Sequence, residues 1–321
     1  MRQGVADLLA HAGAPRRSPQ LAAPDLSPWL HGNALPGVWS FDAQAPGPHV
    51  CIVALTHGNE IAGAVALDRL LRAGVRPLSG RLSLVFANLD AFLRFDPDDP
   101  TASRFLEEDL NRLWDYAELE GPRRSCELRR ARALRPVLDT ADVVLDLHSM
   151  LWPADPLFLV GGVAESLDLA LRLGEPPLVV ADAGHEAGRR MIDYGHFGVP
   201  RSGRRGLLLE AGWHWEEATA QRMERVALRL LARTGLLPAS APAQEPAASR
   251  IAHVTRTVTA RSRRFRFTRP WRGGEVVPRA GTLLALDDGH EIRTPHDDCL
   301  LVMPNLLPQP DQTALRLAAY I

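Results

Sequence analysis

Short apolar runs recur between residues 49 and 209 of the chain. The runs at His49–Leu55, Arg81–Ala87 and Val143–Leu147 contain few polar residues, which is typical of strands buried within a sheet. Similar runs occur at Leu157–Val160, Leu178–Val180 and Gly206–Leu209. We therefore expect these runs to be the strands of one largely buried sheet.

Segments with apolar residues at helical spacing lie between and after these runs. Ile61–Ala73 has that spacing and is followed by Gly74, a residue type that commonly ends helices. Cys126–Leu138 is an amphipathic segment rich in arginine, and Glu216–Arg233 is a third predicted helix. Strands that alternate with helices predict an α/β domain whose sheet is mainly parallel or mixed and is flanked by helices.

The pattern changes after Leu236. Residues 238–248 read PASAPAQEPAA, a proline-rich composition typical of a linker. From Arg250 onward apolar and polar residues alternate between turn-forming pairs such as Gly273-Gly274 and Asp288-Gly289, which predicts short antiparallel strands. We expect four segments: an N-terminal arm at 1–45 with one short helix at Gly4–His11, an α/β domain at 46–237, a linker at 238–249 and a smaller all-β domain at 250–321.

Composition narrows the classes of function. The chain has 321 residues, 46% of them hydrophobic, so it can bury a sizeable core. Its formal net charge of -1 argues against nucleic acid or an anionic membrane as a partner. Three scattered cysteines predict neither a disulfide framework nor a CxxC metal site. With no signal-peptide pattern and no apolar run near the ~20 residues that span a bilayer, we expect a cytoplasmic protein.

Two histidines and a glutamate stand at the carboxyl ends of predicted strands. His57 and Glu60 follow the first strand three residues apart, and His148 follows the strand at Val143–Leu147. Ligand sites in open α/β sheets form at this edge, and two histidines with one carboxylate are a standard zinc set. A histidine after a strand is more often a hydrogen-bonded turn residue, but the pair His57 and Glu60 together with His148 favours one zinc ion per chain.

Two further carboxylates fit this hypothesis. Asp146 shares a strand face with His148 and is a candidate to orient its imidazole, although a capped turn explains it equally well. Glu210 follows the apolar run at Gly206–Leu209, where a buried carboxylate is costly unless it has a task or a partner. Because zinc acidifies bound water and polarises a carbonyl, Glu210 is the candidate to move the proton in a hydrolysis.

Four motifs in series resemble the succinylglutamate desuccinylase/aspartoacylase family of zinc carboxypeptidase-like hydrolases. They are His57-Gly58-Asn59-Glu60, Asp109-Leu110-Asn111-Arg112, Asp146-Leu147-His148 and Glu210-Ala211-Gly212. The order and rough spacing match from about residue 49 to 215, and the β-rich C-terminal segment also fits. The resemblance implies a zinc-carboxypeptidase-like mixed sheet and the removal of an acyl group from an N-acyl amino acid.

The resemblance also assigns roles to individual residues. It implies that His57, Glu60 and His148 bind zinc and that Glu210 is the general base and acid. Arg104 would help to polarise the scissile carbonyl, and Asn111 and Arg112 would contact the carboxylate of a small-molecule substrate. Gly212-Trp213-His214-Trp215 departs from the family, and so does the segment that ends in Arg201, Arg204 and Arg205, one of which is a candidate contact for an acyl carboxylate.

Several alternatives remain open at this stage. The same metal set would serve a zinc carboxypeptidase acting on a peptide-type amide, or a zinc-binding protein without catalysis. His185, His196 and His214 are weak candidates for a second metal site. The arginines and phenylalanines near Phe265 alternate as on a half-exposed strand, which favours a solvated face over a nucleic-acid site. Homo-oligomerisation, the acyl group and the amino acid stay undetermined.

Overall fold

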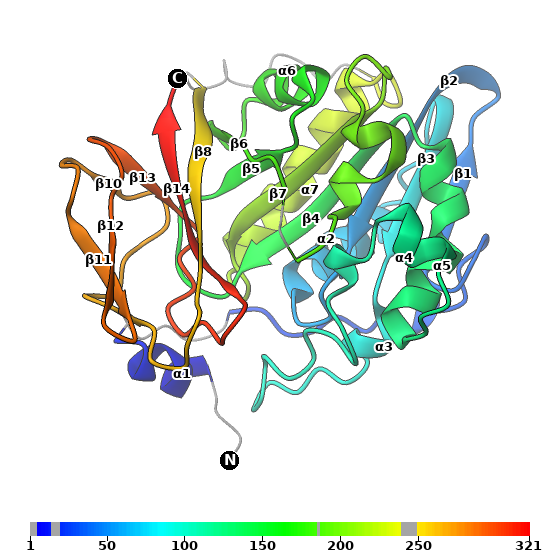
Figure 1. The fold of residues 1–321 in the computed structure, drawn as a ribbon. Coiled ribbons are helices and arrows are strands. Elements are labelled where there is room, and N and C mark those ends of the chain that lie inside the picture. Colours follow the sequence, from blue (N-terminus) through cyan, green and yellow to red (C-terminus); the bar gives the residue numbers. More distant parts are fainter. Residues whose placement is uncertain (1–4, 14–19, 185–186, 239–248) are drawn as a thin grey trace.

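A large mixed sheet organises the molecule. The computed structural model describes residues 5–13, 20–184, 187–238 and 249–321. Within these ranges, eleven strands form one sheet in the order β1-β3-β2-β4-β7-β5-β6-β8-β14-β13-β10, and three form a second sheet in the order β12-β11-β9. This arrangement confirms the expected α/β fold with antiparallel strands toward the C-terminus (Figure 1).

The centre of the large sheet is parallel and fully covered. Its strands are β3 (Ser79–Phe86), β2 (Ala45–Ala54), β4 (Val143–Met150) and β7 (Arg205–Trp213). Every residue of β4 is buried, including the polar residues Asp146, His148 and Ser149 toward its carboxyl end. β5 (Leu157–Val160) pairs antiparallel with β7, and β6 (Leu178–Ala181) pairs parallel with β5.

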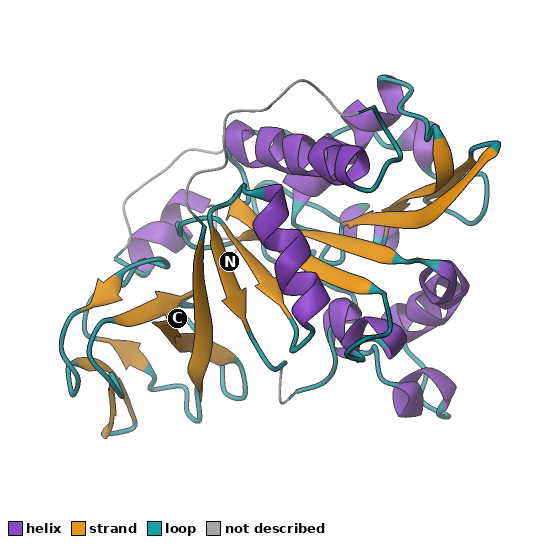
Figure 2. Cartoon of the chain, turned by 90° about the horizontal axis from the view of Figure 1, so that it is seen from above, coloured by secondary structure: helices purple, strands orange, loops and turns teal. Residues whose placement is uncertain are grey.

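Helices cover both faces of this sheet (Figure 2). On one face, α2 (Ile61–Arg72), α6 (Ala164–Leu173) and α7 (Glu217–Arg233) contribute to one apolar cluster. On the other face, α5 (Cys126–Thr140) packs in a second cluster. The shorter helices are α1 (Val5–His11), α3 (Leu89–Phe92), α4 (Tyr116–Glu120) and the 3-10 turns η1 (Ser27–Trp29), η2 (Leu110–Arg112), η3 (Met191–Asp193) and η4 (Gly195–Gly198). None of the described helices is both long and apolar enough to cross a bilayer.

The structure contains elements that the sequence pattern did not indicate. β1 (Val38–Asp42) lies within the segment interpreted as an arm, and it pairs antiparallel with β3 at the edge of the sheet. It is partly exposed, so it lacks the unbroken apolar run of the central strands. α6 was also not expected. It follows the pair Gly161-Gly162 and supplies only ten residues of helical pattern.

The C-terminal strands are joined to the central sheet by hydrogen bonds. β8 (Arg250–Thr259) pairs parallel with β6 and antiparallel with β14 (Thr313–Tyr320). β13 (Cys299–Val302) and β10 (Val276–Val277) complete this sheet, and the second sheet consists of β9 (Arg266–Phe267), β11 (Leu283–Asp287) and β12 (His290–Arg293). Most of the linker expected at 238–249 lies outside the described residues, so the domain boundaries stay a prediction.

Candidate metal centre

His57 and Glu60 lie in the loop that joins β2 to α2. The imidazole Nδ1 of His57 is 2.7 Å from Glu60 Oε1, and both side chains are buried. Gly58 lets this loop approach its neighbours closely, because a Cβ atom there would lie 2.5 Å from the backbone N of Phe92 and from the backbone O of Ser103. Glycine is therefore required between the two predicted ligands for reasons of space.

His148 joins these residues from the neighbouring strand. The pairing of β2 with β4 ends at Val53↔Asp146, so the sheet opens just before His148. His148 Nδ1 is 3.2 Å from Glu60 Oε2, and the rings of His57 and His148 have centroids 5.0 Å apart. One potential ligand atom from each of the three residues lies within 4.8 Å of the others. The fold thus brings the three expected ligands to one point.

The orientation of the imidazoles fits a metal ion. Both Nδ1 atoms face Glu60, whereas the Nε2 atoms face other carboxylates. His57 Nε2 is 3.0 Å from Asp109 Oδ1, and His148 Nε2 is 2.8 Å from Asp146 Oδ2. Carboxylates that accept from the second nitrogen fix the tautomer and direct the first nitrogen toward a metal. The donor set is the one that zinc prefers in catalytic sites.

Burial and opposite charges shape the titration of these groups. Burial alone would raise the pKa of the Glu60 carboxyl, but the imidazoles of His148 and His57 lower it well below its ordinary value. Burial would lower the pKa of His148, but Asp146 and Glu60 raise it well above the ordinary histidine value. The pKa of Asp109 is likewise held low against its burial by His57 and Arg104. The centre therefore favours ionised carboxylates.

Glu210 faces this centre from β7. It is the register partner of His148, so the two residues lie side by side on adjacent parallel strands. Its side chain is buried, and Oε2 has no hydrogen-bond partner among the described residues. Burial raises the pKa of Glu210 to about 8, against the lowering effect of His148. This carboxyl group exchanges a proton near neutral pH, as an acid-base catalyst must.

Arg104 reaches the centre from the loop that precedes η2. Its Nη2 donates to Asp109 Oδ2 at 3.2 Å and lies 2.9 Å from His57 Nε2. The backbone N of Gly58 donates to the carbonyl O of Arg104 at 3.0 Å, which fixes the two loops together. The guanidinium is 39% exposed, so it borders the centre and still contacts solvent.

Asn111 and Arg112 occupy the turn η2, which is capped by Asp109. The carboxylate Oδ1 of Asp109 accepts from the backbone N of Asn111 at 2.8 Å. Asn111 is buried; its Nδ2 lies 3.3 Å from His148 Nε2, and its Oδ1 accepts from the backbone N of Met191. Burial lowers the pKa of Arg112 to about 10, and its Nη2 lies 4.0 Å from Asp109 Oδ2. Both ends of the Asn111 amide therefore contact other protein groups, whereas the contact of the Arg112 guanidinium with Asp109 is longer.

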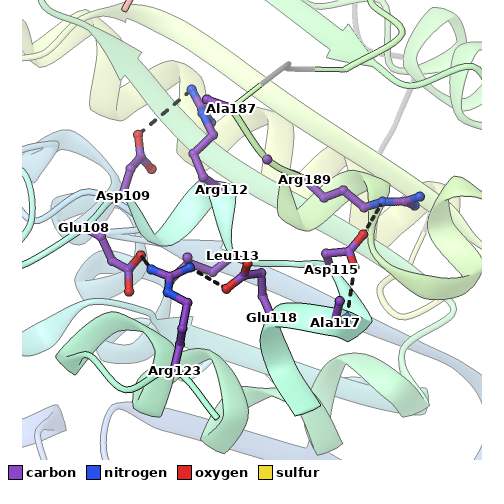
Figure 3. Close-up of a pocket in the computed structure, with 11 residues that line it drawn as sticks. Glu108, Asp109, Arg112, Leu113, Asp115, Ala117, Glu118, Arg123, Ala187 and Arg189 are labelled. Carbon is purple, nitrogen blue, oxygen red and sulfur yellow. Dashed lines mark hydrogen bonds and ion pairs between the residues drawn. The ribbon is translucent and has the colours of Figure 1, made fainter. Parts of the chain in front are cut away.

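A cavity of about 550 Å³ adjoins the centre at Asp109 and Arg112 (Figure 3). Charged side chains line much of it. Arg123 pairs with Glu108 and Glu118, and the remaining charged lining residues are Asp115 and Arg189. The backbone of Gly188 closes one side, where a Cβ atom would lie 2.2 Å from the carbonyl O of Arg112. The cavity offers space next to the candidate substrate-binding arginine.

Ser149, which the sequence analysis left without a role, supports Glu60 and contacts His214. The backbone N of Ser149 donates to Glu60 Oε2 at 2.8 Å, and Ser149 Oγ lies 2.7 Å from His214 Nδ1. Burial lowers the pKa of His214 to about 4, so this imidazole is neutral. The sequence places His214 in the Gly212–Trp215 segment and makes it a weak candidate for a second metal site, and neither consideration indicates its contact with Ser149.

Other candidate residues lie elsewhere. Among the described residues, His57, Glu60 and His148 are the one group able to hold a metal, and His196 is exposed whereas His214 is buried. His185 lies outside the described residues. Arg204 donates to backbone carbonyls just before β4, at the opposite end of that strand from His148. The side chains of Trp213 and Trp215 are buried in the apolar core.

Comparisons with known proteins agree with these observations. Residues 46–155 match the model of the succinylglutamate desuccinylase/aspartoacylase catalytic domain, which confirms the resemblance. A search of curated proteins finds no match.

Solved structures share the fold. A succinylglutamate desuccinylase from Vibrio cholerae superposes with a TM-score of 0.69 at 21% identity, over 89% of this chain and 86% of that one. The corresponding Vibrio parahaemolyticus structure has the same TM-score and coverage at 18% identity. The ectoine utilization protein EutE (DoeB) of Ruegeria pomeroyi gives a TM-score of 0.61 at 17% identity, over 94% of this chain and 98% of that one.

Proposed function

Given that residues 46–155 match the succinylglutamate desuccinylase/aspartoacylase catalytic domain, we propose that the chain is a zinc-dependent amidohydrolase. It removes an acyl group from an N-acyl amino acid or a similar small amide that carries a carboxylate. One observation carries this proposal. The buried carboxyl of Glu210, whose pKa is about 8, lies beside His148, and His148 forms the candidate metal-binding set together with His57 and Glu60.

The metal-binding residues are His57, Glu60 and His148. The two histidines would hold the metal through Nδ1, because their Nε2 atoms face Asp109 and Asp146. A zinc ion held there supplies a Lewis acid that polarises a carbonyl oxygen and lowers the pKa of water. The protein keeps both imidazoles and the carboxylate in place through these outer hydrogen bonds.

Glu210 moves the proton. As a carboxylate, it accepts a proton from the water molecule that attacks the acyl carbon. As a carboxylic acid, it then donates that proton to the amine nitrogen when the carbon-nitrogen bond breaks. Its buried Oε2, which has no partner among the described residues, is the atom available for this transfer. A pKa near the working pH suits both halves of the cycle.

Two arginines interact with the negative charges of the substrate. Arg104 stabilises the negative charge that develops on the carbonyl oxygen, since its guanidinium lies within 3.2 Å of groups at the centre. Arg112 binds the carboxylate of the amino acid, and Asn111 orients this turn and contacts the same carboxylate. The adjoining cavity accommodates the remainder of the amino acid.

The names of the solved relatives guide the choice of substrates. Proteins with this fold include succinylglutamate desuccinylases and an ectoine utilization protein. We therefore place N-succinyl amino acids first in a panel that also contains other N-acyl amino acids and a short peptide. Hydrolysis of the peptide alone would favour a carboxypeptidase-type activity in place of the deacylase.

The proposal is tested by Glu210→Gln in zinc-loaded protein. Loss of the proton carrier is expected to lower kcat on the best substrate by about 10²–10⁴-fold while zinc content stays at one ion per chain. The matched control is Glu291→Gln, an exposed glutamate on β12 that is expected to retain full activity. Full activity in the zinc-loaded Glu210 variant would show that the proposed mechanism is wrong.

A further inference from the structure

Arg316 is the one charged residue of β14, in the sequence TALRLAAY. Its side chain is only 8% exposed, and its neighbours in the strand are buried apolar residues. A guanidinium in such a place is costly to bury unless it is paired or binds a ligand. Its described polar contact uses Nε, which donates to Asp182 Oδ2 at 2.8 Å. That leaves two Nη groups without a partner among the described residues.

A chain of contacts connects Arg316 with the turn that carries Arg112. Asp182, just after β6, also accepts from Arg190 Nη1 at 3.1 Å, and its backbone O accepts from Arg190 Nη2. The next residue, Met191, donates its backbone N to Asn111 Oδ1 at 2.8 Å. The C-terminal strand thus lies against the candidate substrate site.

Four arginines gather in this region. The guanidinium groups of Arg104, Arg112, Arg190 and Arg316 are accompanied by the carboxylates of Glu60, Asp109, Asp182 and Asp193. Burial lowers the pKa of Arg112, and the charges of Arg104, Arg316 and Arg190 lower it further against the effect of Asp109. An anion would therefore relieve repulsion among these arginines.

We propose that Arg316 is a specificity-determining residue whose Nη groups bind a second anionic group of the substrate, beyond the carboxylate bound by Arg112. The last strand of the chain thereby completes the site and gives dicarboxylates an advantage over monocarboxylates. This inference rests on the proposed function, because it names a further part of the same site.

Binding to zinc-loaded protein tests the inference without hydrolysis. By calorimetry, succinate is expected to bind at least about tenfold more tightly than butyrate, a monoanion with an equally long chain. Arg316→Gln should reduce this ratio about tenfold, and Arg316→Lys should retain part of it. Arg293→Gln, which changes an exposed arginine of β12, is the matched control and should leave the ratio unchanged.

A purely structural ion pair predicts a different outcome. In that case Asp182→Asn and Arg316→Gln would lower thermal stability alike, and neither would change the succinate-to-butyrate ratio. That result, or a wild-type protein with no preference for succinate, would overturn the inference. A preference that depends on Arg316 in a protein that hydrolyses no amide would contradict the proposed function alone.

Discussion

Carboxylates that contact His57 and His148 determine which imidazole nitrogen of each can bind a metal. Asp109 and Asp146 each face an Nε2 atom, and Thr56 donates to the free oxygen of Asp146 at 2.7 Å. The role suggested for Asp146 from strand alternation agrees with this contact, because residues two apart share a face. The contact of Asp109 depends on how a long loop folds back, so no local pattern predicts it.

Glu210 provides a pH-dependent prediction at the residue scale. Its pKa of about 8 in the folded chain lies above the ordinary value of 4.5, so the folded state binds its proton more tightly than the unfolded state. Stability of the metal-free protein should therefore fall as pH rises from about 4.5 to 8, by up to about 1.4 kcal/mol per pH unit from this group.

Urea unfolding of wild-type and Glu210→Gln proteins across this range measures the effect. The difference between the two stability curves is expected to slope between pH 4.5 and 8 and to level off outside it. Glu291→Gln should give a curve parallel to that of the wild type throughout the range. Parallel curves for Glu210→Gln would mean that its carboxyl group has an ordinary pKa in the folded protein.

At the scale of elements, the central strands could be predicted because each is a short apolar run. β14 could not, because Arg316 interrupts its apolar pattern and one of its two neighbouring strands, β8, lies more than fifty positions earlier in the chain. The loop from β2 to α2 could be predicted only in part. Its motif indicated ligands, but the tight contact of Gly58 with the end of α3 and with the loop at Ser103 appears only in three dimensions.

Gly58→Ala should therefore disrupt the candidate metal-binding loop. Its Cβ atom would meet two backbone atoms at 2.5 Å, and neither can move without shifting the loop. We expect a loss of about 2 kcal/mol or more in unfolding free energy and weaker zinc binding. Gly162→Ala is the control, since a Cβ atom there has nothing within 4 Å. Chemical denaturation and zinc titration measure both effects, and equal behaviour of the two variants would contradict this explanation.

At the scale of the whole molecule, the hydrogen bonds between β6 and β8 make the C-terminal strands part of the large sheet. The change of sequence pattern after Leu236 indicated a separate all-β domain, because local patterns do not reveal which strands pair across a linker. Arg316 links the C-terminal strands to the candidate site, because its side chain on β14 donates to Asp182 beside that site.

A continuous sheet predicts that the chain unfolds as one unit. Separating β8 from β6 would expose backbone groups and apolar residues such as Ala252, which belongs to the same core cluster as α5. In calorimetry we expect a single transition whose calorimetric and van't Hoff enthalpies agree. Under the proposed function zinc binds the folded site alone, so its removal should shift that whole transition to lower temperature. Two transitions, only one of them sensitive to zinc, would show instead that the C-terminal strands fold independently.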